Sequence, residues 1–210
     1  MKSVYSVILR DELVKKLDAV AYENGVSRSV MLNKILADYL EMETPDTVMD
    51  GIFARMETLF SSIANMRFVN QASASMASVQ SALEYRYNPK VKYVLELFPS
   101  GDLGQLKITL RSQNPALIAL LEDFYTFFAQ LESHYIGERA YAYQDNRFVR
   151  VFVRPNGFSA EKIGEAITSY VQNFDEYLGI YFSNLSQINN AKYLIEVKYR
   201  KDISKKEILL

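Results

Sequence analysis

The start of the fold is decided by residues 4–13, VYSVILRDEL, where the spacing of the apolar side chains changes. One side of the first half of this run carries Tyr5, Val7 and Leu9, and the other carries Val4, Ser6 and Ile8. This period of two, with its β-branched residues, predicts a short strand. From Asp11 onward the apolar residues follow a helical period, so the strand is expected to lead directly into a helix.

Two helices are predicted after the strand. The apolar face of the first consists of Leu13, Leu17, Val20 and Ala21. Asn24-Gly25 suits its C-terminal end, and Ser27 suits the N-cap of the next helix. The apolar face of the second consists of Met31, Leu32, Ile35, Leu36 and Tyr39, and Thr44-Pro45 is expected to end it.

A strand and two short helices bury too little apolar surface to be stable alone. A single edge strand also leaves its backbone donors and acceptors unpaired. Antiparallel pairing with the same strand of a second chain would correct both defects, so the sequence predicts a homodimer or a higher oligomer.

The order and spacing of these segments resemble a known family. Residues 5–13, the turn Asn24-Gly-Val-Ser-Arg-Ser29 and the helical pattern from Met31 to Leu40 are similar to the ribbon-helix-helix family of the CopG, Arc and MetJ type. The resemblance covers residues 1–43, and the DNA-binding and dimerisation domain that it implies is expected over residues 1–45. It implies a dimer whose paired strands enter the major groove of duplex DNA.

The resemblance also implies which residues would contact DNA. The implied DNA-binding residues are Lys2, Val4, Ser6, Ile8, Arg10, Ser27, Arg28 and Ser29. Val4 and Ile8 can touch thymine methyl groups but form no hydrogen bonds, so base specificity is expected to be low or biased to A·T pairs. The start of the second helix at Ser27–Ser29 matches the phosphate clamp of the family. The alternative is a module kept mainly for dimerisation, because acidic side chains outnumber basic ones in residues 1–43.

Composition restricts the chemistry. The net charge is −1, so any affinity for nucleic acid must come from a local surface. The chain has no cysteine, which excludes disulfides and thiolate metal sites. His134 is the single histidine, and phosphate-binding glycine motifs are absent. The adjacent carboxylates Glu122-Asp123 and Asp175-Glu176 diverge on their helices. We therefore expect no catalytic site, no metal and no cofactor.

A helical connector is predicted over residues 46–87. Its apolar residues follow the seam spacing of a coiled coil: Met49, Ile52, Met56, Leu59, Ile63 and Met66. Two interpretations remain open. The helix could pack on its own C-terminal domain, or it could continue the dimer axis.

Residues 88–210 are predicted to form an α+β domain with a mainly antiparallel sheet in a ββαββαβ order. Strands are expected over 91–98, 105–111, 139–143, 147–154 and 192–201, and helices over 115–135 and 159–185. This domain is expected to serve oligomerisation, effector sensing or partner binding.

The second hairpin of that domain carries a candidate binding surface. Alternation would place Ala140, Ala142, Val149, Val151 and Val153 in the core. The opposite face would then carry Arg139, Tyr141, Tyr143, Phe148, Arg150, Phe152 and Arg154. Such a face could stack a nucleotide-like effector or nucleic acid, or bind a partner protein. The alternative is that helices or a second chain cover it.

The sequence thus favours a dimeric DNA-binding transcriptional regulator with a C-terminal sensing or oligomerisation domain. The alternative is a DNA-bound accessory factor of plasmid mobilisation or partition that recruits a partner protein. No apolar run is long enough to span a membrane, and the N-terminus lacks a signal-peptide pattern. A cytoplasmic, nucleoid-associated location is expected.

Overall fold

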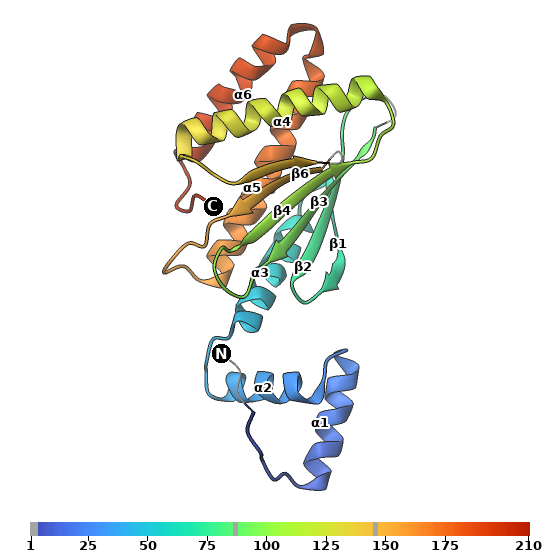
Figure 1. The fold of residues 1–210 in the computed structure, drawn as a ribbon, viewed down its shortest axis with the longest axis vertical. Coiled ribbons are helices and arrows are strands. Elements are labelled where there is room, and N and C mark those ends of the chain that lie inside the picture. The colour runs from blue at the N-terminus through green and yellow to red at the C-terminus, as the bar shows by residue number, and fades with distance from the viewer. Residues whose placement is uncertain (1–3, 86–87, 145–146) are drawn as a thin grey trace. The chain divides into compact units, whose positions relative to one another are not determined.

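The computed structural model describes residues 4–85, 88–144 and 147–210, and only the backbone of residues 70–72 and 144. It divides into two compact units, residues 1–47 and 48–210. The first unit contains the helices α1 (Asp11–Glu23) and α2 (Arg28–Tyr39), both predicted from the sequence (Figure 1). Asn24 ends α1, Gly25 takes a positive φ of 64°, and the Ser27 side chain caps α2, as the sequence predicts.

Residues 4–10 form no strand in the single chain. The expected ribbon is therefore not seen, and the first regular element is α1. Arg10, at the N-cap of α1, has the extended backbone angles φ −69° and ψ 142°. A strand needs a hydrogen-bonded neighbour, and the described part of this chain supplies none to residues 4–10.

The second unit is a mixed α/β structure with a six-stranded antiparallel sheet, which confirms the α+β class. Its helices are α3 (Pro45–Phe60, entering from the first unit), α4 (Pro115–Ile136), α5 (Ala160–Ser183) and α6 (Ile188–Ile203), with a 3₁₀ turn at Leu185–Gln187. Its strands are β1 (Met66–Ser73), β2 (Met76–Ala82), β3 (Lys90–Leu97), β4 (Gly104–Leu110), β5 (Tyr141–Gln144) and β6 (Arg147–Phe152). The spatial order is β1-β2-β3-β4-β6-β5.

The connector prediction is wrong beyond Phe60, where α3 ends and the β1–β2 hairpin begins. Ala77, Val79 and Ser81 of β2 point into the core, so this Ala- and Ser-rich stretch carries a strand period that its small residues concealed. In α3 itself, Met49, Ile52 and Met56 are buried in the core of the second unit. The interpretation that this helix packs on its own C-terminal domain is therefore confirmed.

Helices cover one face of the sheet (Figure 1). Tyr125 of α4 stacks on Phe148 of β6 with ring centroids 4.8 Å apart. Phe174 of α5 meets Tyr93 of β3 edge-on at 6.2 Å. This aromatic layer is the main core, and burying rings of this size is a large source of stability.

The last element corrects a second prediction, because residues 192–201 lie in α6 and form no strand. Ala191, Ile195 and Tyr199 are buried at a spacing of four, the period of a helix. Tyr199 meets Phe128 of α4 and Tyr177 of α5. In the described part of the chain, no helix combines the length and apolar character needed to cross a lipid bilayer.

Candidate functional site

The extended segment at residues 4–10 exposes apolar side chains on both of its sides. Val4 and Ile8 are fully exposed, at 99% and 101% of their reference areas. Tyr5 and Val7, on the side opposite the implied DNA-binding residues Val4 and Ile8, are also exposed at 84% and 66%. Lys2 lies outside the described residues.

The two helices of the first unit expose much of their expected core as well. Leu17, Ala21 and Met31 form a small buried cluster. Exposed apolar residues on the same helices include Leu13, Val20, Ile35, Leu36 and Tyr39. A single chain thus leaves most of the apolar surface of this module in contact with solvent.

The N-terminus of α2 keeps the geometry expected of an anion site, with one added constraint. The Ser27 hydroxyl accepts a hydrogen bond from the Val30 amide at 3.4 Å. The Arg28 guanidinium donates two hydrogen bonds of 2.6 Å to the Asp18 carboxylate. These bonds lower the pKa of Asp18. Both side chains remain exposed, so a phosphate that binds Arg28 competes with Asp18, a partner that the sequence did not reveal.

The second hairpin faces the opposite way from the prediction. Phe148, Arg150 and Phe152 are at most 2% exposed and lie against α4 and α5, while Val149 and Val151 face the other side of the sheet. Both faces of β6 are apolar enough to be buried, so alternation alone could not select one. The larger rings fill the space between the sheet and the helices, so the described residues of this hairpin form no open stacking surface.

The other members of that expected surface make internal contacts. Arg150 pairs with the buried Glu132, which also accepts a hydrogen bond of 2.7 Å from the Tyr141 hydroxyl. Tyr143 packs against Tyr125 at 5.6 Å. Arg139 and Arg154 donate to main-chain oxygens, Arg139 to Leu210 and Arg154 to Phe98, Gly101 and Asp102. These contacts tie the residues to the rest of the fold, and the burial of Phe148, Arg150 and Phe152 removes the centre of the expected surface.

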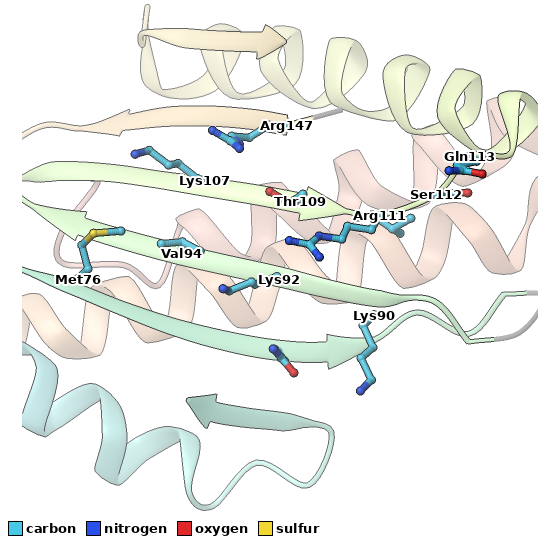
Figure 2. Close-up of a pocket in the computed structure, with 12 residues that line it drawn as sticks. Met76, Lys90, Lys92, Val94, Lys107, Thr109, Arg111, Ser112, Gln113 and Arg147 are labelled. Carbon is cyan, nitrogen blue, oxygen red and sulfur yellow. The ribbon is translucent and has the colours of Figure 1, made fainter. Parts of the chain in front are cut away.

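A different surface stands open on the sheet face opposite the helices. Figure 2 looks onto this face, with the labelled side chains in front of the strands and helices behind them. Strand register aligns one row across the sheet: Arg67, Gln80, Lys92, Thr109 and Arg147. We call this side of the sheet the basic face.

The charge of the basic face is one-sided. Its cations are Arg67, Lys90, Lys92, Lys107 and Arg147 on the strands, with Arg111 just after β4. Of the described strand positions on this side, Glu96 alone is acidic. It accepts hydrogen bonds from Lys107 at 2.7 Å and from Gln105 at 2.8 Å. Both bonds lower the pKa of Glu96, and the bond from Lys107 has the larger effect. The one carboxylate among the described strand positions of this face is therefore neutralised, and the remaining cations dominate.

The basic face encloses a broad open hollow of about 1150 Å³. Its lining consists of Met76, Gln80, Lys90, Lys92, Val94, Lys107, Thr109, Leu110, Arg111, Ser112, Gln113 and Arg147 (Figure 2). Hydroxyl and amide groups thus accompany the cations. The described lining contains no aromatic side chain, so planar rings have no stacking partner there.

Sequence reasoning missed the basic face, although the signal was present. The hairpin of β3 and β4 was predicted correctly, and Lys90, Lys92 and Lys107 alternate with its buried residues. Placing the alternate residues of both strands on one side would have brought these cations together.

Among the described residues, no three His, Asp or Glu side chains come together in a way that could hold a metal ion. Comparison with protein-family models, with curated proteins and with solved structures found no match to this chain.

Proposed function

We propose that the protein is a homodimer that binds duplex DNA through its first unit, with residues 4–10 of two chains paired as an antiparallel ribbon. The observation that carries this proposal is the extended segment with four exposed apolar side chains, those of Val4, Tyr5, Val7 and Ile8. Folding normally removes such side chains from water, at roughly 25 cal/mol per Å² buried. A second copy of the segment would supply both the missing ladder and the missing cover.

Three further features support the proposal. The helices that follow expose the apolar residues that a dimer would bury. Paired strands would direct alternate side chains outward, away from the core of the dimer. In β-ribbon proteins that bind DNA, such outward side chains enter a groove of the duplex. The capped N-terminus of α2 would add phosphate contacts through free amides and the helix dipole.

Val7→Pro tests the ribbon. Proline removes the amide hydrogen needed by the ladder and the β-branched side chain needed by the core. We expect the variant to sediment as a monomer in analytical ultracentrifugation and to lose its DNA gel shift. The control, Val7→Thr, keeps the amide and the branched shape and should stay dimeric. A Val7→Pro protein that remains a DNA-binding dimer would exclude the ribbon.

Two opposed variants test the phosphate clamp. Arg28→Ala with Ser29→Ala should weaken binding to all duplex sequences alike and flatten the salt dependence, because fewer counterions are released. Asp18→Asn should act in the other direction, since it frees the Arg28 guanidinium and removes a negative charge. Fluorescence anisotropy with duplexes of several sequences measures both. Unchanged affinity in both variants would remove the clamp from the proposal.

A further inference from the structure

The cations of the basic face are spaced to contact an extended polyanion. Lys92 and Arg147 lie in the same row with β4 between them. Neighbouring strands are about 4.8 Å apart, which separates these two backbones by about 10 Å. Lys90 and Lys92 are two residues apart along β3, which is about 7 Å. Charges therefore extend both across and along the sheet.

Five cations of the basic face have no charged partner among the described residues, whereas the sixth, Lys107, pairs with Glu96. In the described part of the chain, Arg67, Lys90, Lys92, Arg111 and Arg147 form no ion pair or side-chain hydrogen bond that would balance their charge. On the helical side, in contrast, lysines are paired with carboxylates, such as Lys192 with Asp123 and Lys198 with Glu176. A cluster of like charges without counter-charge repels itself, and an anionic partner would relieve that repulsion.

The chemistry of the face selects among anionic partners. A second copy meeting the same face would bring like charges together, which is unfavourable. Single-stranded nucleic acid is usually held by stacking its bases on aromatic rings, and the described lining has none. Duplex DNA presents its phosphates outward and keeps its bases stacked, so cations with hydroxyl and amide donors suffice to hold it.

We propose that the basic face is a second DNA surface, which binds the phosphate backbone of duplex DNA without reading its sequence. Lys90, Lys92, Arg111 and Arg147 would pair with phosphates, and Thr109 and Gln80 would donate hydrogen bonds to phosphate oxygens. This surface belongs to the second unit and does not depend on the ribbon proposed for the first. It gives a protein with a net charge of −1 a local region suited to nucleic acid.

The test uses the full chain and a labelled 20-base-pair duplex of mixed sequence. Lys92→Ala with Arg147→Ala removes two cations from the central row. We expect the plot of log affinity against log salt to become shallower by about 1.8, since each lost phosphate contact removes about 0.9 from the slope. Affinity at low salt should fall roughly tenfold or more. An unchanged slope in a folded variant would overturn the proposal.

The matched control is Lys201→Ala with Lys205→Ala, which makes the same change in net charge at the end of α6. The slope of log affinity against log salt should equal that of the parent protein within experimental error. If the control loses as much slope as Lys92→Ala with Arg147→Ala, only net charge matters, and the proposal is overturned. Lys90→Gln with Arg111→Gln provides an independent pair on the same face. Thermal melting of each variant shows that it is folded before its affinity is compared.

Further arms separate this surface from the ribbon and from other ligands. Binding that is unchanged by Arg28→Ala with Ser29→Ala but reduced by Lys92→Ala with Arg147→Ala would support the basic face as a DNA surface. The same result would exclude the phosphate clamp at α2. The reverse result retains the clamp and overturns the basic face. A single strand of the same sequence that binds more tightly than the duplex would overturn the duplex assignment. Displacement of the duplex by low millimolar pyrophosphate would instead indicate a small-anion site and would equally overturn it.

Discussion

Arg150 and Glu132 form an ion pair that solvent does not reach, with side chains 0% and 1% exposed. The guanidinium contacts the carboxylate through two hydrogen bonds of 3.2 Å, and the hydroxyls of Tyr141 and Tyr170 donate to the same carboxylate at 2.7 Å and 3.1 Å. Removing a charge from water is costly, and in a buried pair the attraction between the two charges offsets that cost. If one member is removed, the other remains buried without compensation and the protein is destabilised.

Arg150→Met should therefore destabilise the protein strongly. It leaves the Glu132 carboxylate buried without its counter-ion, at a cost of about 3–5 kcal/mol in the free energy of unfolding. Adding Glu132→Gln removes the stranded charge and keeps an acceptor for the tyrosine hydroxyls, so the double variant should recover much of the loss. Urea denaturation of the three proteins measures both steps. A single variant that loses less than about 1 kcal/mol would contradict this role.

Asp175 should make stability depend on pH. Burial raises the pKa of this carboxyl, against the opposing effect of hydrogen bonds donated by Ser81 at 2.5 Å and Tyr93 at 2.6 Å. Between the ordinary aspartate pKa of about 4 and the raised folded value, the native state holds more protons than the unfolded state. The stability contribution of Asp175 is therefore greatest at low pH and decreases as pH rises through the folded pKa.

Asp175→Asn isolates that contribution, because the amide stays neutral and keeps an acceptor oxygen. The variant should gain stability relative to the parent protein as pH increases above about 4, and the difference should become constant once the pH exceeds the raised pKa of Asp175 in the folded protein. Denaturant melts at constant ionic strength over this range give the difference. A difference that does not change with pH would show that Asp175 keeps an ordinary pKa in the folded protein.

At the scale of elements, the crossing of α3 and α5 depends on Gly164. A Cβ placed there would lie 2.9 Å from the Cβ of Arg55 and 2.9 Å from the carbonyl oxygen of Ile52. The backbone of α3 cannot easily move away, so Gly164→Ala should cost about 1–3 kcal/mol by overpacking. That loss exceeds the helix-propensity gain of about 1 kcal/mol.

Gly179 in the same helix is the matched control. A Cβ at this position meets nothing within 4 Å. Gly179→Ala should therefore stabilise the protein by up to about 1 kcal/mol, as expected for alanine in a helix. Opposite signs for the two substitutions in chemical denaturation would support close α3–α5 packing, and equal signs would argue against it.

At the scale of the whole molecule, the two units should unfold separately. The first unit buries a cluster of only Leu17, Ala21 and Met31, with Leu32 packed against it, whereas the second has an extensive aromatic core. If the first unit dimerises as proposed, its melting temperature should rise with protein concentration. Calorimetry at several concentrations should show an early transition that moves and a later one that does not. One cooperative transition for the whole chain would contradict this division.

Features set by neighbours along the chain could be read from the sequence. Ser27 as an N-cap, Gly25 after α1 and Pro115 at the start of α4 all act within one turn of their own backbone. The β3–β4 hairpin was equally clear, because strict alternation between apolar and charged residues gives each strand one buried face.

Features set by distant contacts could not be read in that way. On β6, valines alternate with Phe and Arg, and only the space below α4 and α5 decides that Phe148 and Arg150 turn inward. Residues 192–201 alternate like a strand, yet Ile195 and Tyr199 find their cover at helical spacing. The basic face is partly of this kind, because the sheet register adds Arg67 of β1 and Arg147 of β6 to the lysines that the β3–β4 hairpin already brings together. Residues close together in the sequence determine the backbone conformation that a segment prefers. Which face of the segment becomes buried depends on the surface that distant parts of the chain place against it.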